Sequence, residues 1–337
     1  MKTAITGATG HLGANLVRIL LEERRDIRVM VRDDLRGLEG LDVETIRGDV
    51  TDPASLMRLF SGADTVLHLA GRISITGTED PDLSSINVEG VRKVVDACVE
   101  SGVRRLVHVS SIHAFSTKPN EEVLDETRKL ALGNHHKPYD RSKAAGQLEA
   151  LKGIDRGLEV VVVNPTAIIG PHDFKVSAMG KVILDIYHHR LPALVDGGYN
   201  WVDVRDVAKA VLLAEKKGKS GESYLISGHW RSLLELAAYI TRHTGKATSR
   251  TAIPYTAALF FSYFSGAFSR ISGRPTNFNP FSMQSIRCHR FISHLKATRE
   301  LGYVPRPFEE TVEETMTWFD EAGMLDGARK SPIDSLR

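Results

Sequence analysis

Tyr139 and Lys143 are the side chains best suited to acid–base chemistry, and they lie four positions apart in the run YDRSK. Residues at this spacing share one face of a helix, and Pro138 is a favourable first helical residue. An ordinary tyrosine titrates at about pH 10, and a neighbouring ammonium stabilises the phenolate and lowers that pKa. The pair is therefore predicted to exchange a proton with a substrate oxygen near neutral pH.

Two serines follow the apolar run 106–109 and could orient the same substrate oxygen. Ser111 is the better candidate, because Ser110 falls one residue closer to the strand and to the ring of a cofactor. A role of His113 as general base is the alternative at this position. The predicted catalytic group is Ser111, Tyr139 and Lys143.

A glycine-rich segment, TGATGHLG at residues 6–13, joins the first apolar run to a helical pattern. Gly7 allows a tight turn, Gly10 lets the backbone approach a pyrophosphate, and Gly13 lets the helix pack against the strand. The helix N-terminus would face the negative charge. A turn without a ligand is the alternative. The predicted cofactor contacts here are Thr6, Gly7, Thr9, Gly10, His11, Leu12 and Gly13.

The second strand ends in Val31 and Arg32, where an enzyme that selects NAD usually places a carboxylate for the ribose 2′-hydroxyl. Arg32 favours the 2′-phosphate of NADP instead, with Arg36 as a second cation nearby. A solvated loop arginine is the alternative, and Asp33 lies close enough to serve NAD. The sequence therefore favours NADP over NAD.

Further cofactor contacts are expected after the third and fourth strands. Asp49, with Val50 beside it, could accept a hydrogen bond from the adenine amino group, and a loop Asx turn is the alternative. His68 is interpreted as a packed core histidine. The residues after it allow close backbone approach to a cofactor, at Leu69, Ala70 and Gly71.

These side chains require a scaffold of strands alternating with helices, and the first 165 residues have that pattern. Strands are expected at residues 3–5, 27–31, 43–46, 65–69, 106–109, 160–163 and 224–226. Helices are expected at residues 16–20, 88–99 and 138–151, and another opens with Asp52 and Pro53. Strands that are apolar on both faces predict a sheet covered on both sides. The expected fold is α/β, a Rossmann-type doubly wound parallel sheet with a smaller, mainly helical substrate domain.

The alternation breaks beyond Asn164, and helices at residues 233–243 and 308–319 dominate the remainder. The dinucleotide-binding domain is assigned to residues 1–165, with returns at about 199–228. The substrate-binding domain is assigned to residues 166–198 and 229–322, and residues 323–337 are expected to form a flexible tail. The uncharged, aromatic-rich segment 255–268 is interpreted as a packed helix of the second domain. An apolar lid or a peripheral membrane contact is its alternative role.

The composition is that of an ordinary globular protein, with 42% hydrophobic and 26% charged residues among 337. A net charge of +2 gives no field that would steer the chain to nucleic acid. Two distant cysteines, Cys98 and Cys288, indicate a reducing compartment, and no metal site is predicted. The first strand begins at Lys2, and no apolar run has the length of a membrane span. The expected location is the cytoplasm, without a signal peptide.

Taken in order, the motifs resemble those of the extended short-chain dehydrogenase/reductase family over nearly the whole chain. The motifs are TGATGHLG, GDVTD at 48–52, HLAG at 68–71, SSIHAF at 110–115, YDRSK at 139–143, NPTAIIGP at 164–171, WVDVRDVA at 201–208 and LKATRELGYVPR at 295–306. The resemblance implies a nicotinamide cofactor, a catalytic Ser111–Tyr139–Lys143 centre and a homodimer formed through the helices at 88–99 and 138–151. It also implies that the nicotinamide is covered by Pro165, Thr166 and Ile168.

Within that family, NPTAIIGP and the Val-Arg strand end are most similar to dihydroflavonol 4-reductases, and the SSI turn is similar to 3β-hydroxysteroid dehydrogenases. This resemblance implies reduction of a ketone, or oxidation of the alcohol, on a hydrophobic ring-containing or lipid-like small molecule. A nucleotide-sugar epimerase or dehydratase is the first alternative. Such enzymes bind a diphosphate with arginines, whereas this chain has Gly198-Tyr199-Asn200 at one such position, and only Arg287 and Arg290 could replace them. An NADP-binding sensor without turnover is the second alternative, and the intact Ser–Tyr–Lys set argues against it.

Overall fold

The computed structural model describes residues 2–74, 80–191, 193–248, 251–260, 262 and 290–326. Its centre is a seven-stranded sheet with the order β10-β6-β5-β4-β1-β2-β3. Every neighbouring pair of strands in this sheet is parallel. The strands are β1 (Lys2–Thr6), β2 (Asp26–Val31), β3 (Glu44–Arg47), β4 (Thr65–His68), β5 (Arg105–Val109), β6 (Glu159–Pro165) and β10 (Ser223–Ile226).

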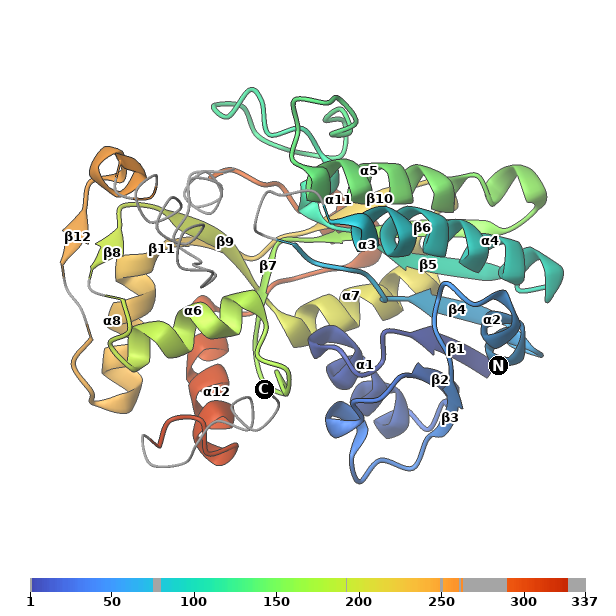
Figure 1. Cartoon of the computed structure of the whole chain (residues 1–337), viewed down its shortest axis with the longest axis horizontal. Helices are drawn as coiled ribbons and strands as arrows, with labels where there is room; N and C mark the ends of the chain where they lie inside the picture. The colour runs from blue at the N-terminus through green and yellow to red at the C-terminus, as the bar shows by residue number, and fades with distance from the viewer. Residues whose placement is uncertain are drawn as a thin grey trace.

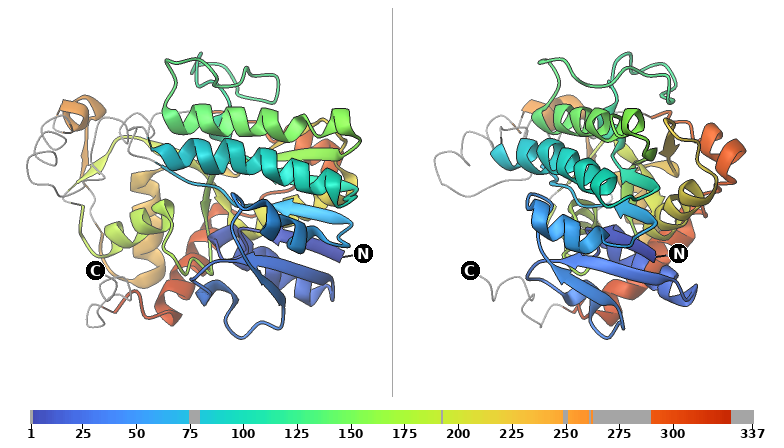
Figure 2. Two further views of the ribbon diagram at one scale, coloured as in Figure 1. Left: turned by 45° about the vertical axis from the view of Figure 1, so that its right-hand side comes forward. Right: turned by 90° about the vertical axis from the view of Figure 1, so that its right-hand side faces the viewer.

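Helices cover both faces of the sheet (Figure 1). One face carries α2 (Pro53–Phe60), α4 (Val91–Glu100) and α5 (Pro138–Leu151), and the other carries α1 (His11–Glu22), α7 (Val204–Lys217) and α11 (Leu295–Leu301). Figure 2 shows α4 and α5 stacked side by side along one face. Adjacent strand residues point to opposite faces, so Val66 and Leu67 of β4 are both fully buried, each in a different hydrophobic cluster. The doubly wound parallel sheet predicted from the sequence is therefore confirmed.

The predicted elements of this sheet are present, with small differences at their ends. α5 has the predicted bounds, and α2 begins at Pro53 with the carboxylate of Asp52 accepting from the backbone N–H of Ala54 (3.1 Å) and Ser55 (3.2 Å). The helix predicted at 88–99 differs, because a π-helical stretch, η2 (Ser85–Gly90), precedes α4. Its Asn87 amide donates to the carbonyl of Arg72 (2.9 Å) and to Ser142 Oγ (3.0 Å) of α5. A wide turn of this kind is a frequent feature of functional sites.

The remaining elements form a second body around its own hydrophobic cluster, at the left of Figure 1. Its described part includes the helices α6 (Ala178–Tyr187), α8 (Leu233–Thr244) and α12 (Phe308–Glu321), a helical stretch at 255–260, and two small sheets. The sheets are β11 (His229–Ser232), β9 (Gly198–Asp203) and β7 (Ala167–Ile169), and β12 (Ala252–Ile253) with β8 (Leu194–Val195). These strands of two to six residues were not predicted, because such short runs show no clear alternation. α11 packs on α7 and β10 of the large sheet, although it falls within the range assigned to the substrate domain.

Shorter elements complete the described chain: α3 (Pro81–Ser84), η1 (Arg36–Leu38), η3 (Ile112–Ala114) and η4 (Ile154–Arg156). In the segment 255–268, residues 255–260 are helical with Ala258 buried, whereas 261 and 263–268 lie outside the described residues. Residues 327–337 of the predicted tail also lie outside them. Within the described chain, no helix is both long and apolar enough to cross a membrane. The same residues contain no group of three or more His, Cys, Asp or Glu side chains that could hold a metal ion.

Candidate active site

The glycine loop between β1 and α1 leaves no room for side chains at two of its three glycines. Gly7 has a φ of 75°, and a Cβ there would lie 2.6 Å from the backbone nitrogen of Ala70. A Cβ at Gly13 would lie 2.2 Å from the carbonyl oxygen of Gly7. At Gly10, by contrast, the nearest atom would be 3.3 Å away. Packing within the protein therefore requires Gly7 and Gly13, while Gly10 keeps space that a ligand could use.

The N-terminus of α1 has the properties of an anion site. Its N-cap is Gly10, with no side-chain cap and no acidic residue in the first turn, so the first N–H groups are available to a ligand. His11 Nε2 lies 3.2 and 3.1 Å from the carbonyl oxygens of Gly170 and Pro171, and the Asn15 amide donates to Pro171 O at 2.9 Å. The ring of His11 is thus held by the loop that follows β7, which leaves its backbone N–H for a cofactor.

The predicted arginines at the end of β2 differ in their freedom. The Arg32 side chain is 70% exposed, and its Nη1 lies 3.6 Å from Asp49 Oδ2. Arg36 instead donates to both carboxylate oxygens of Asp34, at 3.0 and 2.7 Å. Arg32 is therefore the arginine of this pair that a phosphate could recruit without breaking a bidentate ion pair.

Asp49 forms an Asx turn, the alternative to adenine binding, because its Oδ1 accepts from the N–H (2.9 Å) and the hydroxyl (2.8 Å) of Thr51. Its Oδ2 remains directed at Arg32. Val50 is buried beside the turn, the backbone of Leu69 and Ala70 lies against Gly7 of the glycine loop, and Gly71 lies beside Lys143 and Asn87.

Lys175 is a candidate cofactor residue that the sequence did not single out. It lies between β7 and α6, and its Nζ donates to Thr9 Oγ1 of the glycine loop at 3.1 Å. The same ammonium lies 3.7 Å from Asp34 Oδ2. A cation from the second body is thus placed against the predicted phosphate cradle, and no motif marks it because the contact joins residues 166 positions apart.

Ser111 and Tyr139 lie together as predicted. The Ser111 hydroxyl is hydrogen-bonded to the phenol of Tyr139, and it also accepts from the backbone N–H of His113 at 3.2 Å. The backbone carbonyl of Ser111 accepts from the Asn164 amide at 3.0 Å, which fixes the end of β5 against β6. The serine is therefore held in place to share a substrate oxygen with the phenol.

Lys143 lies one helical turn beyond Tyr139 and is only 9% exposed. Burial lowers the pKa of its ammonium to about 8. In the described chain it has no hydrogen-bond or ion-pair partner, and the buried Ser110 Oγ has none either. A Cβ at Gly71 would lie 3.3 Å from Lys143 Nζ. Two unpaired buried polar groups beside a glycine cradle fit a dinucleotide, whose ribose and nicotinamide could pair with them.

The pKa of Tyr139 is raised to about 12, chiefly by burial, with the Ser111 hydrogen bond acting against the shift and the charge of Asp140 adding to it. Lys143 does not contribute to this shift in the protein alone. The lowering expected from the Tyr–Lys spacing is therefore absent here, because desolvation of the phenol dominates.

The sequence profile of the NAD dependent epimerase/dehydratase family matches residues 3–227. The chain belongs to this family. A sterol demethylase protein B of Methylococcus capsulatus is 34% identical over 96% of this chain and all of that protein. A putative dihydroflavonol 4-reductase of Synechocystis is 30% identical over 95% of both chains. The crystal structure of gox2253 superposes with a TM-score of 0.82 at 30% identity, over 96% of this chain and 98% of the other.

Family membership confirms that the protein is an enzyme of the extended short-chain dehydrogenase/reductase type, as the motif series predicted. It also supports a nicotinamide cofactor, since the family is NAD dependent. The segment predicted to cover the nicotinamide spans the end of β6 and β7, with Pro165 buried and Ile168 packed on the large-sheet core. Thr166 Oγ1 donates to Asn200 Oδ1 at 3.1 Å, and that oxygen also accepts from Gly228 N at 2.9 Å.

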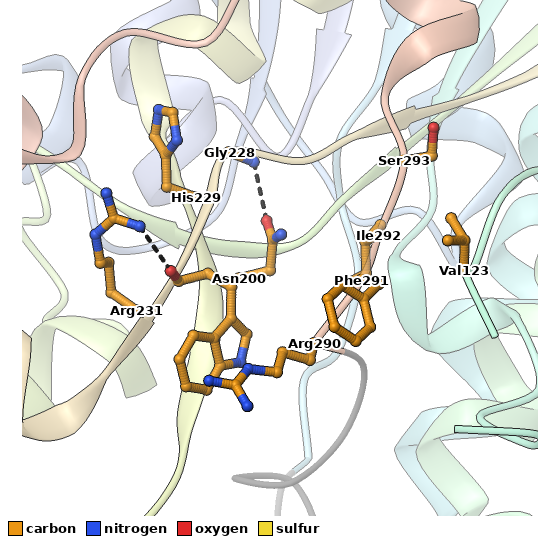
Figure 3. Close-up of a pocket in the computed structure, with 10 residues that line it drawn as sticks. Val123, Asn200, Gly228, His229, Arg231, Arg290, Phe291, Ile292 and Ser293 are labelled. Carbon is orange, nitrogen blue, oxygen red and sulfur yellow. Dashed lines mark hydrogen bonds between the residues drawn. The ribbon is translucent and has the colours of Figure 1, made fainter. Parts of the chain in front are cut away.

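Beyond Asn200, this family member has an open pocket of about 320 Å³ (Figure 3). Two aromatic side chains contribute to it, and the Arg290 guanidinium lies 4.2 Å from the ring centroid of Trp230. Phe291 is 56% exposed at its rim. Arg287, the other arginine that the sequence offers for binding a diphosphate, lies outside the described residues. The lining residues are Val123, Asn200, Gly228, His229, Trp230, Arg231, Arg290, Phe291, Ile292 and Ser293.

Proposed function

We propose that this protein is an NADP-dependent oxidoreductase that interconverts a ketone and an alcohol on a hydrophobic, ring-containing or lipid-like substrate. The observation that carries the proposal is the set of Ser111, Tyr139 and Lys143, in which a serine is bonded to a partly buried phenol one turn from a buried, unpaired ammonium. A scaffold that only bound a nucleotide would need none of these three groups in this arrangement.

The roles of the chain's own residues follow from this arrangement. Bound NADP(H) supplies or accepts the hydride. Ser111 donates a hydrogen bond to the substrate oxygen and orients it toward Tyr139, whose hydroxyl gives that oxygen its proton during reduction and takes it back during oxidation. Lys143 binds the nicotinamide ribose and, once brought close by that contact, favours the phenolate that remains.

The substrate class is supported by the pocket next to Thr166. Trp230 and Phe291 supply aromatic surface, and flat apolar substrates are bound by such walls. Two relatives that match nearly the whole chain have names that refer to sterols and dihydroflavonols, which are apolar ring-containing molecules. The choice of NADP is supported by Arg32, whose guanidinium is exposed just after the end of β2, the place from which this type of fold contacts the adenosine ribose.

The test measures NADPH and NADH consumption with a panel of planar ketones, sterol ketones and UDP- or dTDP-sugars. We expect consumption of NADPH on an apolar ketone, and a Tyr139→Phe variant that loses about 10²–10⁴-fold in turnover. Binding of NADPH to that variant, followed by tryptophan fluorescence, should stay within about twofold of wild type because the phenol contributes little to affinity.

Other outcomes would replace the proposal. Conversion of a nucleotide sugar without net cofactor consumption would assign the chain to the epimerases, and Arg290 would then be a candidate phosphate ligand. Tight cofactor binding without turnover of any compound would favour a sensor.

A further inference from the structure

Asn200 presents an oriented hydrogen-bond donor to the open pocket (Figure 3). The residue is only 7% exposed, and its Oδ1 accepts from Thr166 Oγ1 at 3.1 Å and from the backbone N–H of Gly228 at 2.9 Å. Because a backbone N–H can only donate, the amide atom that faces Gly228 must be the oxygen. The amide nitrogen is therefore left to the pocket, and it has no hydrogen-bond partner in the described chain.

Arg290 supplies a positive charge to the same pocket. It is exposed, and its guanidinium lies 4.2 Å from the ring centroid of Trp230. A cation–π contact uses no N–H···O hydrogen bond, so the N–H groups of the guanidinium remain able to bind an acceptor. Among the described residues, no carboxylate pairs with Arg290 and no oxygen accepts from it. Its donors are therefore available to a ligand.

The pairing of β9 with β11 brings these two groups together. Trp230 of β11 is the register partner of Asn200 of β9 in an antiparallel ladder. Directly opposed residues of such a ladder place their side chains on the same face, with Cβ atoms about 4.5–5.5 Å apart. The guanidinium of Arg290 lies over the ring of that same Trp230. One ligand group in the pocket can therefore contact both the Asn200 amide and the Arg290 guanidinium.

The other basic side chains of the lining are engaged elsewhere. Arg231 donates to a backbone carbonyl at 3.0 Å and lies 3.8 Å from a carboxylate oxygen of Glu235. His229 Nε2 lies 3.0 Å from the carbonyl oxygen of Arg306, so this nitrogen carries the proton that the acceptor requires. The described residues that line the pocket include neither Asp nor Glu. The pocket therefore offers donors and positive charge to a ligand without a competing carboxylate of its own.

A carboxylate satisfies such donors better than a neutral oxygen does. It brings two acceptor oxygens and a charge that suit a guanidinium, and aromatic walls exclude part of the surrounding water, which strengthens the attraction. We infer that Asn200 and Arg290 bind a carboxylate carried by the ring-containing substrate. Only the description of the bound molecule as a substrate rests on the proposed oxidoreductase function. The two residues would then select acidic ketones among compounds that share the same apolar rings.

The test compares two ligands that differ only in this charge, a 3-oxo steroid with a side-chain carboxylate and the primary amide of the same steroid. Equilibrium dialysis measures their affinities with NADP⁺ present, which cannot reduce the ketone. We expect the acid to bind the wild-type protein at least about fivefold more tightly than the amide, and the difference to shrink as salt is added. Equal affinities of acid and amide would overturn the inference.

Variants assign the difference to its residues. Arg290→Met should lower the affinity for the acid to that for the amide, and change the amide by less than about twofold. Arg242→Met is the matched control, because Arg242 is also exposed and lies over an aromatic ring, Tyr239, at 5.4 Å, outside the pocket. Asn200→Asp keeps both hydrogen bonds that Oδ1 accepts and turns the donor into a charged acceptor, so it should weaken the acid at least about tenfold. If Asn200→Asp folds poorly, the exposed Arg290 still decides, and equal losses of acid and amide in Arg290→Met would refute the inference.

This readout needs no turnover, so it separates the carboxylate site from the proposed oxidoreductase activity. Charge-dependent binding without NADPH consumption on any ketone would refute the activity and uphold the site. Reduction of acid and amide with equal kcat/KM would do the reverse. Where the acid is reduced, Arg290→Met should raise its KM and leave kcat within about twofold, because the carboxylate is bound alike in the ground and transition states. Binding of UDP that Arg290→Met abolishes, with no preference for the steroid acid, would assign the pocket to a diphosphate and overturn the inference.

Discussion

Lys143 carries a positive charge in a buried position, and no carboxylate of the described chain forms an ion pair with it. Its ammonium is buried and has a pKa of about 8, below the ordinary value of 10.5. A group whose folded pKa is depressed in this way costs stability at every pH below that pKa, because the unfolded chain binds the proton more tightly. The cost disappears as the pH rises past the ordinary value, where the lysine is neutral in both states.

Lys143→Met should therefore raise the free energy of unfolding of the cofactor-free protein by roughly 2–3 kcal/mol at pH 7. Urea unfolding at pH 7 and pH 10.5 measures the effect, and the gain should shrink toward zero at the higher pH. The matched control is Lys152→Met, because the Lys152 side chain is 64% exposed and is paired with Glu149 at the surface. A Lys143→Met protein no more stable than wild type at pH 7 would mean that the ammonium is compensated in solution.

At the residue scale, the sequence could indicate groups whose role is encoded in a local spacing. Ser111, Tyr139, Lys143 and the loop glycines are of this kind, and the structure brings the serine and the tyrosine into contact. The contact between Lys175 and Thr9 could not be predicted, because it depends on how two distant segments meet in space. The reversed pKa shift of Tyr139 could not be predicted either, since it is set by burial of the phenol.

At the scale of elements, the turn from β1 to α1 contains one glycine that is required mainly for folding, Gly13, and one that is required mainly for cofactor binding, Gly10. Gly13→Ala should cost about 1–3 kcal/mol or more of stability, because its Cβ would lie 2.2 Å from the Gly7 carbonyl oxygen. Gly10→Ala should cost less than about 1 kcal/mol, because its nearest contact is 3.3 Å, yet it should weaken cofactor binding at least tenfold. Urea unfolding and fluorescence titration with NADPH measure the two quantities. Unchanged affinity in Gly10→Ala would remove this glycine from the binding site.

The adjacent strands β4 and β5 each contribute one buried histidine to the core. His68 of β4 and His108 of β5 are in register, and their rings stack at 5.3 Å. Burial, together with the charge of Lys143, lowers the pKa of His68 to about 3, and burial likewise lowers that of His108 well below its ordinary range. In acid the unfolded chain takes up these protons and the folded chain does not, so stability falls as the pH drops below about 6.5.

Between pH 6.5 and 4.5 each histidine should remove up to about 1.4 kcal/mol of stability per pH unit. His108→Leu should flatten the measured dependence by that amount, as judged by urea unfolding at pH 7.5, 6.0 and 5.0. His135→Gln is the control, because His135 is exposed and its replacement should leave the slope unchanged. Parallel curves for wild type and His108→Leu would contradict the assignment.

At the scale of the whole molecule, the loop after β7 joins the second body to the cofactor cradle, through His11, Asn15 and Lys175. Lys175→Met should weaken NADPH and NADH alike, by roughly three- to tenfold, because its ammonium contacts the loop that both cofactors share. Arg32→Ala should weaken NADPH far more than NADH. The ratio of the NADPH and NADH dissociation constants distinguishes the two variants, and loss of either cation should reduce the salt dependence of NADPH binding. Equal losses for both cofactors in Arg32→Ala would refute its role in the NADP preference.

The large sheet could be predicted from the sequence because its strands are buried on both faces and read as continuous apolar runs, as in Val160 to Val163 of β6. The second body could not be derived in the same way. β7 and β8 have only three and two residues, and they take their conformation from pairing with β9 and β12. Short strands of that kind are fixed by tertiary contacts more than by local pattern.

The strand order has a consequence for how the protein is made. The outer neighbour of β6 is β10, and the helix that covers one face of β5 and β6 is α7, both of which follow the first strands of the second body along the chain. On the ribosome, an emerging chain that ends before α7 would display the open edge of β6 and an uncovered apolar surface, the kind of species that associates with itself. Closure must wait until residues beyond 226 have been synthesised, and α11 adds its cover later still. We therefore expect chaperones that bind nascent chains to act mainly after β6 has been synthesised and before α7 and β10 have emerged.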